Sequence, residues 1–411
     1  MKRKYVIIGN SAAGIGAAEG IRQTDKHGEI IIITNERHHT YSRPLISYLL
    51  LGKITEEQIK YRGDNFYSDN NCTLLKDTEV TKIDAKSKRV VLSDGNLIDF
   101  DKLLVATGSS AFLPKFEGLE KVKNKFTFMS LDDALELNKI LDKEKRVLII
   151  GAGLIGLKCA EGILEKVSKV TVFDLAPNIL PSVLDDGGAK IVQRHIESQG
   201  VEFRLSESIK YFEQNTAVTE SGDTIDFDIL VIAAGVRPNT GLLDNIAKIE
   251  RGIAVNEKCE TTAKDIYAAG DCTQTLDISN GQNKIMALLP NAYMQGECAG
   301  INMAGGEKSF DKAMPMNAVG FFGLHVITAG NYSGDVYAEN DNGNYKRLFY
   351  GDNKLNGYIL IGNIEKAGIY TSLIRERKPL DSLDFALVCE KPGLIAFTKE
   401  ERTVRLGGET I

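Results

Sequence analysis

Two glycine-rich turns constrain the fold of this chain more than any other feature of its sequence. The first lies in the stretch Tyr5-Val6-Ile7-Ile8-Gly9-Asn10-Ser11-Ala12-Ala13-Gly14, and the second in Val147-Leu148-Ile149-Ile150-Gly151-Ala152-Gly153-Leu154-Ile155-Gly156. In each, a short apolar strand ends at the first glycine and an alanine- or leucine-rich helix is predicted to begin. One G-x-G-x-x-G pattern is weak evidence, but two in strand–turn–helix context predict two dinucleotide-binding folds. Two bound dinucleotides in one chain indicate electron transfer between them.

An acidic residue follows each turn at the distance that such a fold requires. Small residues let the backbone approach a pyrophosphate, and the helix N-terminus offers it unpaired N–H groups and the positive end of the helix dipole. A carboxylate roughly 20 residues further on accepts the ribose hydroxyls. Glu36 and Asp174, each at the end of an apolar strand, fill this position. Ser11 replaces a usual glycine and is small enough for the same approach.

The second turn is predicted to bind NAD rather than NADP. Asp174 places a negative charge where a 2′-phosphate would lie. The next four residues, Leu175-Ala176-Pro177-Asn178, contain no Arg or Lys that could neutralise such a phosphate.

Composition narrows the class of protein. A length of 411 residues allows two to three domains. The net charge of −6 argues against a nucleic-acid partner, and no apolar run approaches the roughly 18 residues that would span a bilayer. The basic start Met1-Lys2-Arg3-Lys4 is followed by an apolar stretch that already ends at Gly9. We therefore expect a strand rather than a signal peptide, and a cytoplasmic protein.

Cysteines and histidines give no sign of a metal centre. The cysteines are Cys72, Cys159, Cys259, Cys272, Cys298 and Cys389, and they form no C-x-x-C pair. Iron–sulfur or zinc ligation is therefore not predicted, and most of these residues are expected to be small buried side chains. The pair His38-His39 is expected to be structural or solvated, and no motif for nucleophilic catalysis is present.

The predicted elements repeat one architecture twice. Strand–helix–strand units are predicted over 4–34 and 147–173, β-hairpins over 78–100 and around Gly222, and buried strands before Ala106-Thr107-Gly108 and Ala234-Gly235. Further helices are predicted over 44–51, 55–58, 184–199, 289–304 and 364–377, with strands over 201–205, 317–322, 326–329, 345–350 and 355–361.

The most specific stretch is Thr262-Ala263-Lys264-Asp265-Ile266-Tyr267-Ala268-Ala269-Gly270-Asp271. With it, nearly the whole chain resembles the two-dinucleotide flavoproteins of the pyridine nucleotide-disulfide oxidoreductase family. The resemblance implies an α/β fold of two Rossmann-like domains, as in glutathione reductase, and a C-terminal α+β interface domain. It implies an FAD-binding domain over 1–115 and 246–312, an NAD(H)-binding domain over 116–245 and the interface domain over 313–411. Asp271 would hold the ribityl chain of FAD.

The same resemblance implies the cofactor contacts. FAD would be bound by Gly9, Asn10, Ser11, Ala12, Ala13, Gly14, Glu36, Arg43, Pro44, Val80, Ala106, Thr107, Gly108, Gly270 and Asp271. NAD would be bound by Gly151, Gly153, Leu154, Ile155, Gly156, Asp174 and Gly235. Arg43 is expected either to bind pyrophosphate or reduced flavin, or to form an ordinary surface ion pair.

A missing cysteine indicates the branch of the family. Disulfide reductases, CoA-disulfide reductases and peroxidases carry one or two cysteines after the first acidic residue, but residues 36–48 contain none. The run Tyr41-Ser42-Arg43-Pro44 resembles the branch of NADH:rubredoxin reductases, ferredoxin reductases and the flavin portion of assimilatory nitrite reductases. This implies an FAD-dependent NAD(H) oxidoreductase that exchanges electrons with a small iron carrier protein of rubredoxin or ferredoxin type. The resemblance is also compatible with a homodimer, or with a chain that acts as the NAD-facing subunit of a larger complex.

No catalytic side chain is assigned, because the flavin carries the chemistry. Relatives pair a Lys with a Glu near the flavin, where this chain has Tyr48 and Lys158. Lys158 therefore either lies near the nicotinamide or flavin or is a solvated lysine. Two basic clusters are candidates for carrier docking or ordinary solvated faces: Lys115, Lys121, Lys123 and Lys125, and Arg375, Arg377 and Lys378.

Three interpretations remain open from the sequence. The first is the carrier-linked enzyme. The second makes oxygen, peroxide or a small disulfide the acceptor, against which the missing cysteine argues. The third is a flavin-binding module for assembly or signalling without rapid turnover. The tail 380–411 is expected to be ordered, either contacting a partner subunit or extending the packing.

Overall fold

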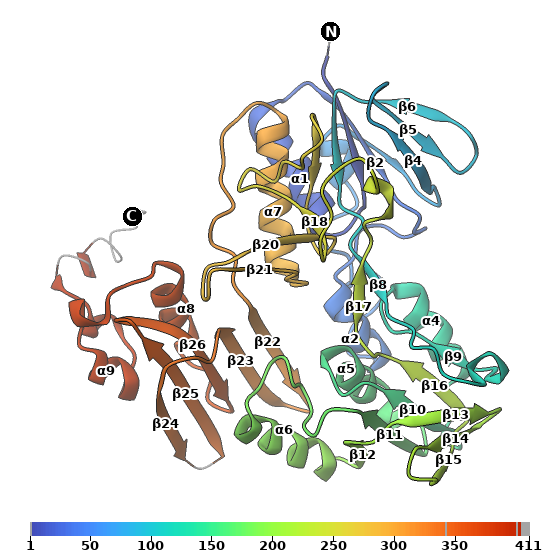
Figure 1. Ribbon diagram of the computed structural model, residues 1–411, viewed down its shortest axis with the longest axis vertical. Coiled ribbons are helices and arrows are strands. Elements are labelled where there is room, and N and C mark those ends of the chain that lie inside the picture. The colour runs from blue at the N-terminus through green and yellow to red at the C-terminus, as the bar shows by residue number, and fades with distance from the viewer. Residues whose placement is uncertain (1, 342, 400–401, 404–411) are drawn as a thin grey trace. The chain divides into compact units, whose positions relative to one another are not determined.

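The computed structural model describes residues 2–341, 343–399 and 402–403, which divide into two compact units (Figure 1). The first comprises Met1–Pro181, Ile196–Thr275 and Asn283–Asp311, and the second Ser182–His195, Leu276–Gln282 and Lys312–Ile411. Ser182–His195 come from the range predicted for the NAD(H) domain. Within the described ranges, no helix combines the length and apolar character needed to cross a bilayer.

A five-stranded parallel sheet in the order β19-β7-β1-β2-β3 carries the first glycine turn. Its strands are β1 (Lys4–Ile8), β2 (Glu29–Ile33), β3 (Cys72–Leu75), β7 (Lys102–Val105) and β19 (Ile266–Ala268). β1 and β2 are nearly continuous runs of β-branched residues because both faces of the sheet are covered. Helices α1 (Ala12–Thr24) and α7 (Leu289–Met303) cover one face. The antiparallel sheet of β4 (Val80–Asp84), β5 (Arg89–Leu92) and β6 (Leu97–Asp99) covers the other.

Glycines bring α1 and α7 into unusually close contact. A Cβ atom at Gly296 would lie 2.0 Å from the carbonyl oxygen of Ala13, and one at Gly300 would lie 2.2 Å from that of Ala17. Any side chain at these positions would push the helices apart. Segments that lie far apart in sequence therefore form one packed layer behind the first glycine turn.

A second five-stranded parallel sheet, in the order β12-β11-β10-β16-β9, carries the second turn. Its strands are β9 (Lys125–Phe126), β10 (Arg146–Ile150), β11 (Lys169–Asp174), β12 (Val201–Leu205) and β16 (Ile229–Ile232). The other elements here are α4 (Leu131–Ile140), α5 (Leu154–Ile163), and the sheet of β13 (Ile209–Glu213), β14 (Thr216–Thr219) and β15 (Thr224–Asp226). A two-stranded ribbon of β8 (Ser109–Ala111) and β17 (Val236–Pro238) joins the two folds.

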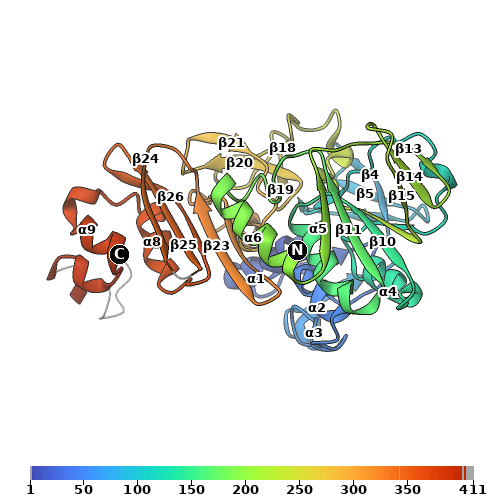
Figure 2. The same ribbon diagram turned by 90° about the horizontal axis from the view of Figure 1, so that it is seen from below.

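The second unit is built on an antiparallel sheet in the order β22-β23-β26-β25-β24. Figure 2 labels strands β23, β24, β25 and β26 of this sheet. The strands are β22 (Met316–Phe321), β23 (Leu324–Gly330), β24 (Asp335–Asp341), β25 (Asn344–Gly351) and β26 (Lys354–Ile361). Helices α8 (Ala367–Arg375) and α9 (Phe385–Glu390) pack on it through a shared apolar cluster. The remaining elements of the chain are α2 (Ile46–Leu50), α3 (Phe66–Asp69), α6 (Asp186–Ser198), β18 (Ile253–Ala254), β20 (Thr273–Asp277) and β21 (Gln282–Lys284).

Local expectations differ from the structure at several places, including the following four. Thr55 and Gln58 exchange the hydrogen bonds of a capping box, but they close a turn and no helix follows. The helix predicted over 364–377 begins at Ala367, because Lys366 adopts a left-handed conformation (φ 62°). Strand β24 and helix α9 were not predicted. The tail is ordered through residue 399, while the expectation for residues 404–411 lies outside the described residues.

Asp265, at the entrance to β19, predicts a pH effect on stability. Lys88 and Lys102 donate to its two carboxylate oxygens at 2.6 and 2.7 Å. Burial alone would raise the pKa of Asp265, but these two bonds outweigh burial and lower it from 3.8 to about 2. A carboxyl with a depressed pKa stabilises the fold above its ordinary pKa and loses that contribution as the pH falls toward 2.

We therefore expect Asp265→Asn to cost about 1–2 kcal/mol at pH 7. The difference from the unmodified protein should shrink between about pH 4 and pH 2. Urea unfolding of the variant and the unmodified protein at pH 7 and between about pH 4 and pH 2 measures the cost and its dependence on pH. A cost that does not change with pH would contradict the assignment. Asp99→Asn removes an exposed carboxylate paired with Arg89 and serves as the control.

Candidate functional site

The first glycine turn is held tightly against the neighbouring strand. Gly9 has φ 122°, and a Cβ there would lie 2.1 Å from the carbonyl oxygen of Ala106. A Cβ at Gly14 would lie 2.0 Å from the carbonyl oxygen of Gly9. The side chain of Asn10 accepts a hydrogen bond from the Tyr67 hydroxyl at 2.8 Å. The turn therefore places the start of α1 at the carboxyl ends of the strands, where parallel sheets bind ligands.

Glu36, the predicted ribose ligand, is held by two side chains of the following loop. Tyr41 donates its hydroxyl proton to Glu36 at 2.7 Å, and the guanidinium of Arg43 forms an ion pair with the same carboxylate. The Tyr41 hydroxyl also accepts from the backbone N–H of Leu131, and Arg43 donates to the carbonyl oxygen of Met129 at 2.9 Å. These bonds connect the first acidic residue to the start of α4. Arg43 thus has the ion pair that was one of its two expected roles.

Asp271 follows a turn that α7 holds in place. Gly270 has φ 84°, and its N–H donates to the side-chain oxygen of Gln295 at 2.7 Å. The Ser109 hydroxyl donates to Asp271 at 3.3 Å. Burial raises the pKa of Asp271, and the Ser109 bond and the positive charge of Arg43 oppose that rise. Arg43 therefore interacts with both predicted acidic ligands of the first dinucleotide, Glu36 and Asp271.

The second turn repeats the geometry of the first. Gly151 has φ 113°, and a Cβ there would lie 2.2 Å from the carbonyl oxygen of Ala233. Asp174, at the end of β11, accepts hydrogen bonds from the backbone N–H groups of Ala152 at 2.7 Å and Ala176 at 2.8 Å. The carboxylate is thus fixed beside the turn, next to the start of α5. Asp174 therefore lies beside the second glycine turn, as its spacing from that turn predicts, and its role as a ribose ligand stays a prediction.

The residues present fit two dinucleotides. The hydroxyl of Ser11 makes no cap hydrogen bond to α1, and the N-cap of α5 is Gly153, which has no side chain, so neither N-cap occupies the first-turn N–H groups. A Cβ at Gly153, Gly108 or Gly235 would meet no atom within 4 Å. These three glycines border open space at the ends of strands rather than protein. Leu154 and Ile155 form the first turn of α5, as Ala12 and Ala13 do for α1.

Lys158 lies where α5 meets α2 and has a buried partner. Its ammonium forms an ion pair with Glu161, and their side chains are 14% and 7% exposed. The ammonium also lies over the ring of Tyr48, 4.6 Å from its centroid. Gly162 permits this approach, because a Cβ there would lie 3.2 Å from the carbonyl oxygen of Ser47. The alternative of a solvated lysine is therefore wrong.

This buried pair gives a stability prediction. Lys158→Met removes one charge and leaves Glu161 uncompensated, so we expect a loss of about 3–5 kcal/mol. The double variant Lys158→Met/Glu161→Leu should recover most of the loss, because no charge then stays buried. Urea unfolding of both single variants and the double variant measures the coupling. Additive losses would show that the two charges do not depend on each other.

The other predicted residues occupy distinct places. Pro44 lies in the short 3₁₀ turn Arg43–Leu45 before α2. Val80 is buried at the start of β4, in the core on one face of the first sheet. Thr107 exchanges hydrogen bonds with Asn239, whose N–H donates to Gly108. The cluster Lys115, Lys121, Lys123 and Lys125 is exposed. Among the described residues, no three His, Cys, Asp or Glu side chains gather closely enough to hold a metal ion.

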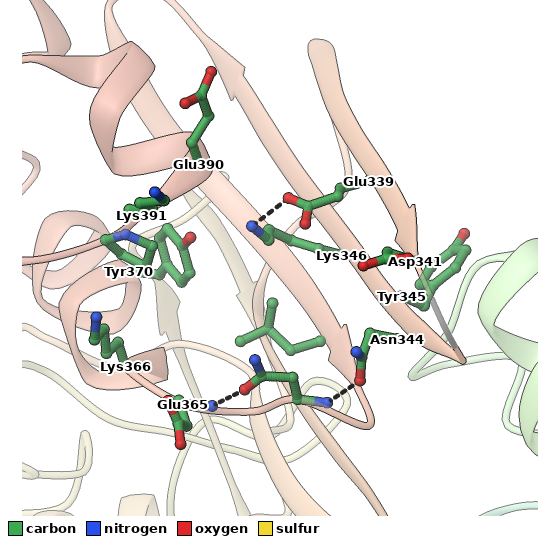
Figure 3. Close-up of a pocket in the computed structure, with 13 residues that line it drawn as sticks. Glu339, Asp341, Asn344, Tyr345, Lys346, Glu365, Lys366, Tyr370, Glu390 and Lys391 are labelled. Carbon is green, nitrogen blue, oxygen red and sulfur yellow. Dashed lines mark hydrogen bonds and ion pairs between the residues drawn. The ribbon is translucent and has the colours of Figure 1, made fainter.

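A polar cavity of about 310 Å³ lies within the second unit (Figure 3). Acidic and basic side chains both line it, among them Lys366 and Glu390. Glu339 and Lys346 form an ion pair in its wall, with 2.5 Å between the carboxylate oxygen and the ammonium nitrogen. It contains none of the predicted cofactor ligands. Well-formed ligand sites are mostly apolar with few polar groups.

Sequence reasoning did not find Tyr41, Asn239, Gln295 and Glu161 as supports of the site. Asn239 and Gln295 act through contacts with residues far along the chain, for which spacing carries no signal. Tyr41 lies five residues from Glu36 in a loop, and Glu161 lies three residues from Lys158 on α5, a helical spacing that could have suggested the ion pair. Tyr41 did belong to the run that indicated the family branch, but its bond to Glu36 was not foreseen.

Comparisons with known proteins agree with this geometry. The family model "Pyridine nucleotide-disulphide oxidoreductase" matches residues 3–296, and "Rubredoxin NAD+ reductase C-terminal domain" matches 315–378. The chain is 30% identical over 395 residues to the NADH-dependent phenylglyoxylate dehydrogenase subunit epsilon of Aromatoleum evansii, covering 92% of this chain and 93% of that protein. It is 34% identical to an NADH oxidase of Methanocaldococcus jannaschii, covering 75% and 71%. The covalent putidaredoxin reductase–putidaredoxin complex has the same fold (TM-score 0.88, 23% identity, covering 99% of each chain).

The chain therefore belongs to the pyridine nucleotide-disulphide oxidoreductase family. The expected α/β fold with a C-terminal domain is confirmed. As a member of this family it is an FAD-dependent NAD(H) oxidoreductase, as the paired turns indicated.

Proposed function

We propose that this protein transfers electrons between NADH and a small iron-containing carrier protein of rubredoxin or ferredoxin type. The observation that carries the proposal is the pair of dinucleotide turns joined through α2 and α5, with no cysteine in the loop that follows Glu36. The match of residues 315–378 to the C-terminal domain of rubredoxin reductases supports this acceptor class.

FAD, when bound, accepts hydride from NADH and can release the two electrons singly. The protein contributes binding and orientation. The start of α1, Glu36 and Asp271 would hold FAD, with Arg43 paired to Glu36 and its positive charge acting on Asp271. The start of α5 and Asp174 would hold NADH. Tyr48 and Lys158 would border the region between the two cofactors, where the pair with Glu161 keeps the lysine's charge locally compensated.

The division of the chain follows from these assignments. We assign residues 1–115 and 246–312 to FAD binding, 116–245 to NAD(H) binding and 313–411 to an interface domain. We propose that all the residues predicted from the sequence to contact FAD and NAD do so. A cytoplasmic location is part of the proposal.

The partner could be a carrier or another subunit. One relative is named as a subunit of an NADH-dependent dehydrogenase, which supports a role as the NAD-facing subunit of a complex. Another is named an NADH oxidase, which supports oxygen as the competing acceptor. The cysteine-free loop leaves no thiol relay there for a small disulfide.

Stopped-flow mixing separates these acceptors. We expect NADH to bleach the flavin absorbance of the purified holoprotein within milliseconds to seconds. Rubredoxin or ferredoxin should then restore it much faster than air-saturated buffer or CoA disulfide does. Slow bleaching by NADH would favour a non-catalytic module. Fast reoxidation by oxygen alone would replace the carrier by oxygen.

A further inference from the structure

Two buried thiols lie near each other in the core behind the first glycine turn. Cys298 projects from α7, and Cys259 lies in the turn that precedes β19. The sulfur of Cys298 is 3.5 Å from the carbonyl oxygen of Glu257, and the sulfur of Cys259 is 3.4 Å from that of Gln295. Each thiol therefore reaches the backbone beside the other, and each influences the pKa of the other. None of the predicted cofactor contacts uses them.

The surroundings make the two thiols unequal. Hydrogen bonding from Cys259 lowers the pKa of Cys298 against the effect of burial, and the charge of Lys308 and the amide of Asn302 lower it further. The Asn302 amide donates to the Cys298 sulfur at 3.4 Å. The carbonyl oxygens of Glu257 and Lys308 near that sulfur favour its protonated form instead. For Cys259, the bond to Cys298 and burial raise the pKa. Cys298 is therefore the better nucleophile of the pair.

We propose that Cys298 and Cys259 form a redox-active pair that hydrogen peroxide oxidises to an intramolecular disulfide. The Cys298 thiolate attacks one peroxide oxygen, the O–O bond breaks, and the departing hydroxide takes a proton to become water. The resulting sulfenic acid is attacked by the sulfur of Cys259, and a second water leaves as the S–S bond forms. In balance, two thiols and one peroxide give one disulfide and two waters.

Burial selects the oxidant. Both side chains are 0% exposed, so a bulky disulfide such as oxidised glutathione cannot reach either sulfur in the folded protein. Peroxide is close to water in size, and the Cys298 sulfur lies 3.2 Å from the carbonyl oxygen of Lys308, whose neighbours Glu307 and Ser309 are exposed. The half-exposed Cys72 lacks a neighbouring thiol among its hydrogen bonds, and burial raises its pKa to about 11. Exposure alone would predict that Cys72 reacts first, whereas the geometry favours the buried pair.

The disulfide would join α7 to the turn before β19. Gln295, one helical turn before Cys298, accepts hydrogen bonds from the Gly270 N–H and the Thr273 hydroxyl. The link would therefore tie together the two segments that position Gly270 and Asp271. We expect the oxidised protein to melt at a higher temperature and to lose FAD more slowly than the reduced protein. This inference does not depend on which electron acceptor the enzyme uses.

The test treats the reduced holoprotein with hydrogen peroxide, quenches, denatures in an alkylating reagent and maps the cysteines by mass spectrometry. We expect the loss of two of the six thiols and a cross-linked peptide pair containing Cys259 and Cys298. Oxidised glutathione should leave all six thiols free. Cys272→Ser, which removes another fully buried thiol, should still form the same cross-link.

Two variants assign the roles of the sulfurs. Cys259→Ser should form no cross-link and should trap a dimedone adduct on Cys298, whereas Cys298→Ser should give neither product. The FAD content and circular dichroism of each variant confirm folding before treatment. Absence of the cross-link in the unmodified protein, a cross-link between other cysteines, or an adduct on Cys259 would overturn the proposal. If both single variants fail to fold, the cross-link in the unmodified protein and in Cys272→Ser still decides it.

Discussion

Replacing Gly153 by valine should abolish tight NADH binding and leave the fold intact. Gly153 is the N-cap of α5 with φ −81°, a conformation that valine adopts without strain. A Cβ there meets no protein atom within 4 Å. The added side chain would occupy the space in which the pyrophosphate approaches the helix. We expect the Kd for NADH to rise roughly 100-fold, equivalent to about 2.7 kcal/mol.

Gly156→Val, three residues further on, is the matched control, and it should destabilise the fold rather than block the nucleotide site. A Cβ at Gly156 would lie 1.9 Å from the carbonyl oxygen of Gly151, so valine would force α5 away from β10. We expect a loss of about 3 kcal/mol or more in the free energy of unfolding. Thermal denaturation of the apoprotein and titration with NADH measure the two effects separately. If Gly153→Val unfolds the protein, or binds NADH normally, the assignment of this turn to the nucleotide is wrong.

Replacing Asp174 by alanine should change which nicotinamide cofactor the protein prefers. The carboxylate lies at the end of β11, where ribose hydroxyls would bind and a 2′-phosphate would be repelled. We expect the Kd for NADH to rise roughly 10- to 100-fold and the Kd for NADPH to rise much less, because removal of the carboxylate also removes its repulsion of the 2′-phosphate.

Asp174 also holds the N–H groups of Ala152 and Ala176, so its loss should loosen the turn and weaken both cofactors to some extent. The ratio of the two Kd values is therefore the decisive quantity, and titrations of protein fluorescence with each cofactor supply it. Glu202→Ala on the neighbouring strand, which removes an exposed partner of Lys169, should leave the ratio unchanged. Equal weakening of NADH and NADPH would contradict the ribose assignment.

Prediction succeeded where short-range sequence determines structure. The strands β1 and β10 and the helices after them were foreseen because continuous apolar runs and the glycines that end them specify a buried strand and a tight turn locally. Strand β12 was predicted over its observed range, Val201–Leu205. Strand β24 was not foreseen, because its sequence Asp335–Asp341 is exposed and largely polar. It forms only by pairing with β25 at the edge of the sheet.

The candidate site divides in the same way. Glu36, Asp174 and Asp271 were identified from their distance to a glycine turn or from a contiguous motif. Their partners could not be read from the chain. Arg43 had two open roles until the fold placed it against Glu36, and Lys158 was an ambiguous lysine until α5 packed on α2 and buried its pair with Glu161.

The sequence by itself determined that two dinucleotide folds are present and that no cysteine lies in residues 37–48 after Glu36, and it predicts that the second fold binds NAD. Those features depend on residues close together in the chain, where the backbone leaves few conformations to choose from. The tertiary structure alone decided what surrounds them. It placed Tyr41 and Arg43 on Glu36, Gln295 on Gly270, and Cys259 against Cys298. The last two contacts join segments far apart in sequence, which only packing of the complete core brings together. Tyr41 and Arg43 lie near Glu36 in the chain, but they are also bonded to the distant residues Leu131 and Met129.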